Sequence, residues 1–134
     1  KEILEFISSG IISAPSKTLS DDLMKTYLTT GIDSSIQRFK DIYRNEQPFF
    51  TLNEKEGIYF ANDLIESNKI SDAITYLKEF IKFYPQSFHI LVAIADAYLK
   101  DKNEGLALRY YRNAAQLNKN DVRVNNLIKK LSNK

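Results

Sequence analysis

A fixed internal repeat constrains this chain more than any other feature of its sequence. When the sequence is shifted by 34 residues, similar side chains fall on one another. The matched pairs are Ala61 with Ala95, Leu64 with Tyr98, Ala73 with Ala107, Ile74 with Leu108, and Tyr76-Leu77 with Tyr110-Tyr111. A repeat of this length indicates a supersecondary unit that buries its apolar face by stacking on its neighbours.

The first repeat has the pattern of two helices joined by a tight turn. Its inward positions are Gly57, Phe60, Ala61 and Leu64 on one helix and Ala73, Leu77 and Phe80 on the other. A capping box, Thr51-Leu52-Asn53-Glu54, precedes the first helix. Asn68-Lys69 breaks the pattern between the helices, and Pro85 ends the second because proline cannot continue a helix.

The second repeat follows the same course from Ser87. It turns at Lys102-Asn103 and returns through Ala107, Tyr111 and Ala114. Alanine at positions 73 and 107 predicts close helix contacts, since a larger side chain would force the two helices of a hairpin apart.

Helices are also predicted on both flanks. Ser20 is expected to cap a helix that ends at Gly31, and Asp33 to cap the helix that follows. Together they form a degenerate hairpin over residues 19–50. Asn120 or Asp121 is expected to cap a last, mostly polar helix over residues 122–132, which suits the end of a solenoid.

Residues 54–87 and 88–121 resemble two tetratricopeptide repeats in their small residues, aromatic residues and Pro85. Gly57, Phe80 and Lys119 depart from that pattern. The predicted fold is all-α: antiparallel helical hairpins stacked as a short right-handed solenoid with a C-terminal capping helix. This domain is expected to cover residues 19–134, and residues 1–18 are interpreted as a linker or the end of an upstream domain.

The order of segments also resembles the C-terminal region that follows the catalytic domain of bacterial β-lactamase-related (penicillin-binding-protein-like) serine hydrolases. The likeness rests on a linker at residues 11–17, on Thr30-Gly31-Ile32-Asp33 and on residues 36–40 before the repeat pair. It implies a bacterial protein of the periplasm or cytoplasm, although the sequence itself leaves the compartment open.

The chain itself lacks the residues of hydrolase chemistry. No serine has a lysine three residues later, and no Gly-x-Ser-x-Gly elbow occurs. The single histidine, His89, has no converging partners in the sequence, and the 4 glycines are not clustered into a phosphate loop. No cysteine and no long apolar run are present. We therefore expect neither an enzyme nor a cofactor, a metal or a membrane span.

Stacked repeats of this family create a concave groove, and the resemblance implies which residues line it. They are Lys55, Ile58, Tyr59, Asn62, Ile65 and Glu66 from the first repeat and His89, Val92, Ala93, Asp96, Leu99 and Lys100 from the second. Family members that bind chaperone tails grip a terminal carboxylate with lysine, arginine and asparagine. Because Ile58 and Asp96 stand at such places here, we do not expect a chaperone tail as ligand.

The expected function is a non-catalytic protein-interaction or structural scaffold domain that uses this groove. The expected partner is a protein or peptide, or a neighbouring domain or subunit of the same protein, since the apolar strip in the groove would be buried against such a surface. The alternative is an accessory domain that shapes or covers the active site of an attached serine hydrolase. Residues 1–99 hold 10 Lys/Arg against 14 Asp/Glu, and residues 100–134 hold 9 against 3. We interpret the basic end as a solvated face and do not expect nucleic acid as partner.

Overall fold

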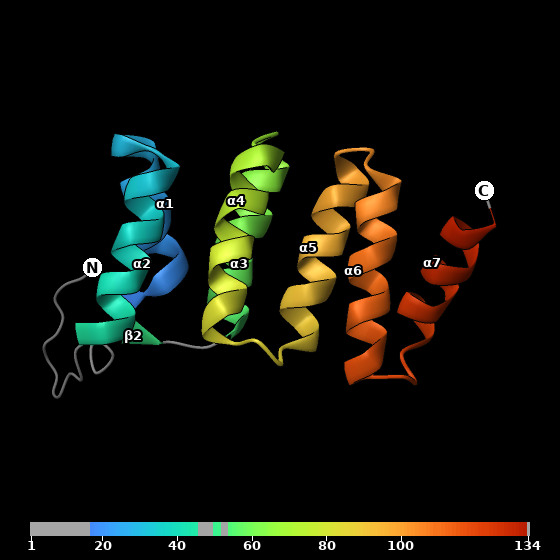
Figure 1. The fold of residues 1–134 in the computed structure, drawn as a ribbon. Helices are drawn as coiled ribbons and strands as arrows, with labels where there is room; N and C mark the ends of the chain where they lie inside the picture. Colours follow the sequence, from blue (N-terminus) through green and yellow to red (C-terminus); the bar gives the residue numbers. More distant parts are fainter. Residues whose placement is uncertain (1–16, 46–49, 52–53, 134) are drawn as a thin grey trace, which may run out of the picture.

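The computed structural model describes residues 17–45, 50–51 and 54–133, and within them the chain is a stack of helices (Figure 1). The helices are α1 (Leu19–Thr30), α2 (Ile32–Asn45), α3 (Glu54–Glu66), α4 (Ile70–Phe80), α5 (Phe88–Lys100), α6 (Glu104–Leu117) and α7 (Val122–Ser132), with a 3₁₀ turn, η2 (Ile81–Phe83), after α4.

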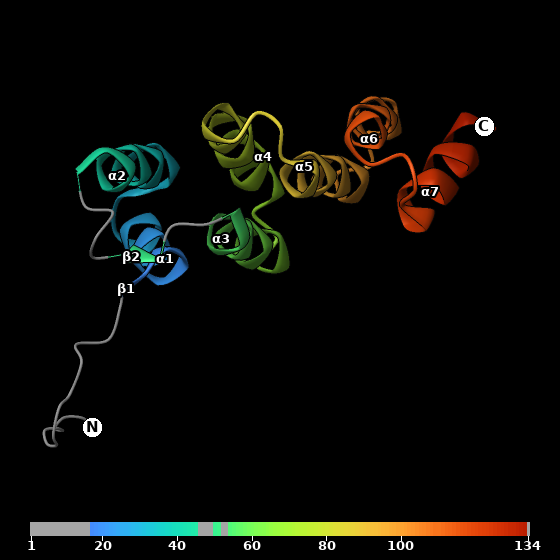
Figure 2. The same cartoon turned by 90° about the horizontal axis from the view of Figure 1, so that it is seen from below.

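The helices pair into three antiparallel hairpins, α1–α2, α3–α4 and α5–α6, and α7 packs on α6 as the cap. Seen from below, α2, α4 and α6 form an outer row, while α1, α3 and α7 lie toward the opposite side (Figure 2). The first hairpin and the cap helix α7 lie at opposite ends of the stack (Figure 1). The predicted all-α solenoid fold is confirmed, and the capping helix spans the expected residues.

Small residues allow the helices to approach closely in the core. Ala61, Ala73, Ala95, Ala107 and Ala114 are all fully buried, as the repeat pattern predicts. Between the first two hairpins the core is aromatic: the Phe39, Phe60, Tyr76 and Phe80 rings pack together, mostly edge to face.

The two repeats turn with the same backbone geometry. Asn68 and Lys102 both adopt positive φ angles, 63° and 62°. In each turn the next residue donates its N–H to a carbonyl of the preceding helix: Lys69 to Leu64 at 2.7 Å and Asn103 to Tyr98 at 2.9 Å. The structure thus repeats at the predicted break points.

Helix caps are present at several ends, and of these the caps at Asp121 and Gly31 were predicted. The Ser87 hydroxyl accepts from the Ile90 N–H at 3.0 Å at the start of α5, and the Asp121 carboxylate accepts from Val124 at 2.9 Å at the start of α7. Gly31 ends α1 with φ at 96°, as predicted for a C-terminal glycine. Of the box that was predicted to cap α3, Leu52 and Asn53 lie outside the described residues.

Two predicted caps are wrong. Helix α1 begins at Leu19, so Ser20 lies in its first turn, and the Ser20 hydroxyl donates to the Glu56 carboxylate on α3 at 3.2 Å. Helix α2 begins at Ile32, directly after Gly31, and Asp33 lies in its first turn. There its negative charge interacts favourably with the positive end of the helix dipole, but its side chain caps no backbone N–H.

The predicted linker ends in a short parallel ladder that the sequence did not indicate. Strand β1 (Lys17–Thr18) pairs with β2 (Phe50–Thr51), so that Lys17 lies opposite Phe50. This ladder joins the start of the first hairpin to the segment that leads into α3. The interpretation of residues 1–16 lies outside the described residues.

Candidate functional site

A groove runs along the face of the stack where α3, α5 and α7 meet. On α3 the groove side chains lie 3, 4, 7, 10 and 11 residues after Lys55, at Ile58, Tyr59, Asn62, Ile65 and Glu66, a helical spacing that places them on one outward stripe. The stripe of α5 faces it, since the opposite sides of both helices are buried against α4 and α6.

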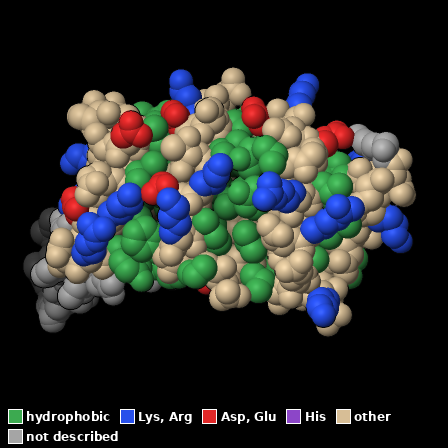
Figure 3. All heavy atoms as spheres, in the orientation of Figure 1, with side chains coloured by type: hydrophobic (Ala, Val, Ile, Leu, Met, Phe, Trp, Pro, Cys, Tyr) green, Lys and Arg blue, Asp and Glu red, His purple; other side chains and the backbone are tan. Residues whose placement is uncertain are grey.

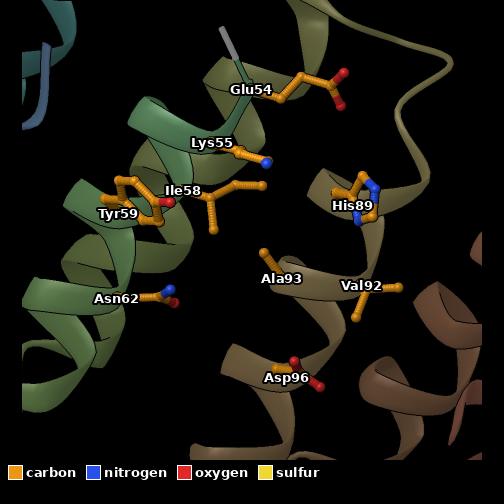
Figure 4. A pocket seen from close by; sticks show the side chains of 9 residues that line it. All are labelled: Glu54, Lys55, Ile58, Tyr59, Asn62, His89, Val92, Ala93 and Asp96. Carbon is orange, nitrogen blue, oxygen red and sulfur yellow. The ribbon is translucent and has the colours of Figure 1, made fainter.

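The first cavity of the groove has a volume of about 620 Å³ and lies between the N-terminal halves of α3 and α5 (Figure 4). Its lining residues are Glu54, Lys55, Ile58, Tyr59, Asn62, His89, Val92, Ala93 and Asp96. Ile58, Val92 and Ala93 make an apolar floor, and Tyr59 stands at the rim with half of its side chain exposed (50%). The cavity therefore suits an apolar side chain framed by polar groups.

The second cavity continues toward the C-terminal halves of the same helices and shares Asn62 and Asp96 with the first. Its volume is about 290 Å³, and its other lining residues are Ile65, Glu66, Leu99, Lys100 and Arg123. All twelve positions expected in a groove thus lie along these two cavities. Their role in binding remains a prediction.

Sequence reasoning missed two lining residues, Glu54 and Arg123. The repeat carried a signal for Arg123, since it stands 34 residues after His89 on the cap helix. Glu54 had no such signal. Its carboxylate accepts from the hydroxyl of Ser87, which joins the start of α3 to the start of α5 at the mouth of the first cavity.

Asp96 does not present a free charge to the groove. Its Oδ1 accepts from the Tyr111 hydroxyl on α6 and from Arg123 Nη2 on α7 at 2.8 Å. Burial, and then the hydrogen bond to Asp96, raise the pKa of Tyr111 far above its usual value. The hydrogen bond to Asp96 also raises the pKa of Arg123. Asp96 therefore orients the arginine and ties the cap helix to the groove.

Other polar groups of the groove are open to a ligand. Within the described residues, the side chains of Lys55, Tyr59, Asn62, Glu66 and Lys100 have no hydrogen-bond partner. His89 is exposed and stands beside the ring of Phe88.

In the described part of the chain no group of three or more His, Asp or Glu residues is placed to hold a metal ion. Nor does any helix there have the length and apolarity to cross a membrane.

Hairpins of this geometry, stacked at a 34-residue period with a groove on the first-helix side, define a tetratricopeptide-type helical-repeat fold. No model of a known protein family matches the chain, and no curated protein matches it. Among solved structures it is similar to the first TPR domain of Spaghetti (RPAP3), bound to the HSP90 peptide SRMEEVD. The sequences are 14% identical, the TM-score is 0.58, and the match covers 86% of this chain and 88% of that one.

At this identity the likeness shows the fold alone. It supports the tetratricopeptide part of the expected resemblance. The comparisons do not show the likeness to the C-terminal region of β-lactamase-related hydrolases.

Proposed function

We propose that this chain is a non-catalytic protein-interaction domain that binds an extended peptide segment in the groove of α3 and α5. The observation that carries the proposal is the combination of an apolar floor with unpartnered polar side chains along one continuous trough. Peptide binding by the RPAP3 domain, which shares the fold, supports it.

The dimensions of the trough set the length of the ligand. Helix α3 has 13 residues, and at 1.5 Å per residue it spans about 20 Å. An extended chain covers that distance with about six residues. We expect an aliphatic side chain over Ile58 and Val92, and a peptide backbone within reach of the Asn62 amide.

The ligand is expected to be an internal segment with no need for a free C-terminal carboxylate. Ile58 offers no charge to such a group, and the Asp96 carboxylate, which already accepts from Tyr111 and Arg123, offers it no hydrogen-bond donor. Peptide SRMEEVD is therefore expected to show no saturable binding by calorimetry, although it binds the RPAP3 domain.

The proposal is tested by selecting from a displayed library of random heptapeptides with blocked C-termini. Selection should enrich sequences with a central aliphatic residue, and Ile58→Asp should abolish their binding because it places a charge on the apolar floor. Thr75→Asp, an exposed change on α4, is the matched control. No enrichment, or equal losses in both variants, would overturn the groove as a peptide site.

The alternative role, cover for an attached serine hydrolase, uses the same groove but makes a different prediction. In that case the groove would bind a folded domain and select no short peptide. The comparisons lend this alternative no support.

A further inference from the structure

The outer face of the solenoid, opposite the groove, carries a second charged surface. Six exposed cations lie on it, and we refer to them as the outer cationic band: Arg44, Lys78, Lys82, Arg109, Arg112 and Lys129. In the space-filling view of this face, Lys and Arg side chains spread across the stack, while Asp and Glu gather mainly along its upper edge (Figure 3).

Contacts between neighbouring helices make this band continuous. Lys40 on α2 and Lys82 after α4 both pair with Glu79, at 3.2 Å and 2.8 Å, so the first two hairpins are joined there. At the other end Arg112 donates to the Ser132 hydroxyl at 3.1 Å, and Lys129 stands one helical turn before Ser132.

Few carboxylates neutralise the band. The outward stripe of α4 and η2 (Ser71, Thr75, Lys78 and Lys82) and that of α6 (Gly105, Arg109, Arg112 and Gln116) contain none. Glu79 is engaged by two lysines, whose hydrogen bonds lower its pKa. Asp41 on α2 is half-buried and accepts from Gln37 at 3.1 Å.

Charge is therefore segregated between the two faces of the solenoid. The groove cavities contain three cations, Lys55, Lys100 and Arg123, and three carboxylates, Glu54, Glu66 and Asp96. The band has six exposed cations and no free carboxylate on its two central stripes. Like charges one turn apart destabilise a helix slightly, so an anionic partner would relieve a standing repulsion.

We infer that the outer cationic band docks an acidic, extended polypeptide segment rich in Asp and Glu. A chain of carboxylates needs only exposed cations at intervals, which the band supplies across three hairpins and the cap. Single-stranded nucleic acid would also need open aromatic faces for its bases. The rings of Tyr43, Phe83 and Tyr110 near the band are half-buried and packed on other rings. Tyr43 and Phe83 lie 4.7 Å apart, and Tyr110 lies 5.6 Å from the buried Tyr98.

The test measures fluorescence anisotropy of a fluorescein-labelled octaglutamate peptide titrated with the whole chain in low salt. Binding is expected, and it should weaken steeply as salt rises and shortens the Debye length. Lys78→Glu/Arg109→Glu should lower the affinity by about tenfold or more, as two attractive contacts become repulsive. Neither side chain has a polar contact among the described residues, so the fold should tolerate both changes.

Lys25→Glu/Lys69→Glu is the matched control, since it makes the same change in net charge at exposed sites outside the band. It should alter the affinity by less than about threefold at moderate salt. Absence of binding at low salt would overturn the inference, as would equal losses in the two double variants. Tighter binding of an octathymidylate of similar charge would show that the band is a nucleic-acid site instead. Ile58→Asp should leave octaglutamate binding unchanged, which separates this test from that of the groove.

Discussion

At the scale of single residues, two departures from the repeat pattern explain each other. A Cβ added to Gly57 would overlap the ring of Phe80, which fills the space beside that glycine. In the second repeat the equivalent positions hold Leu91 and Ala114, a large and a small residue in the opposite order. The volume that α3 gives up is therefore supplied from α4.

This exchange predicts a strong coupling between the two positions. Phe80→Ala alone should cost about 3–5 kcal/mol through the cavity it leaves. Gly57→Leu alone should cost about 1–3 kcal/mol through overpacking. The double variant copies the second repeat and should recover about 1–3 kcal/mol relative to the sum. Urea denaturation of the wild type, the two single variants and the double variant gives the four free energies of unfolding from which the coupling is obtained. Gly105→Ala is the control and should be neutral or slightly stabilising, because this helical glycine is exposed and an added Cβ would meet only Asn103 Oδ1, at 4.0 Å. Additive costs would show that the two sites do not share one space.

Tyr76 gives a second prediction at this scale. It is almost completely buried, and its hydroxyl has no hydrogen-bond partner among the described residues. Burial raises its pKa well above the usual value. The folded state therefore holds this proton more tightly than the unfolded chain. Its contribution to stability is complete below pH about 10 and is lost as pH rises toward the folded pKa.

Tyr76→Phe should thus stabilise the fold by about 1 kcal/mol near neutral pH, because it removes a buried polar group without a partner. It should also make the loss of stability above pH 10 shallower, as followed by urea midpoints at several pH values. Some dependence of stability on pH should persist above pH 10 in this variant, because the pKa values of Tyr27 and Tyr111 are also raised. A loss of 1 kcal/mol or more on substitution would reveal a partner for the hydroxyl.

At the scale of elements, the sequence predicted what depends on local spacing. The turns at Asn68 and Lys102 and the cap at Asp121 were predictable because their chemistry involves residues within one helical turn. Ser20 and Asp33 were assigned wrongly because serine and aspartate suit both the cap and the first turn of a helix. The Ser20 hydroxyl contacts Glu56 instead of capping the helix, and local spacing does not indicate this contact because Glu56 lies 36 residues away in the sequence.

The same distinction separates what was predicted in the groove from what was missed. Positions such as Asn62 and Asp96 recur with the repeat, so their outward stripe could be predicted from the sequence alone. The bonds from Tyr111 and Arg123 to Asp96 join three helices and follow from tertiary packing only.

The outer cationic band was missed for a related reason. Its members are spread from residue 44 to residue 129, and counting charge along the chain shows only the basic end.

At the scale of the whole molecule, the solenoid is built from contacts within each hairpin and between hairpins that are neighbours in the stack. The cap helix α7 covers the exposed side of α6 with Val124 and Leu131, which are 1% and 8% exposed. Removing residues 121–134 should cost about 3–6 kcal/mol, the value of two large apolar side chains taken out of water. The exposed face of α6 should also promote self-association, measurable by light scattering.

The loss should be local, because each repeat contacts only its neighbours. In the truncated chain, amide protons of α5 and α6 should exchange much faster, while those around Phe39 on α2 should keep most of their protection. Full-length Lys129→Gln/Lys130→Gln, which keeps the apolar contacts of α7, is the control and should show native protection throughout. Uniformly faster exchange along the truncated chain would mean that the stack unfolds as one cooperative unit. An unchanged exchange pattern would mean that α7 contributes little to the fold, although it orients Arg123 toward the groove.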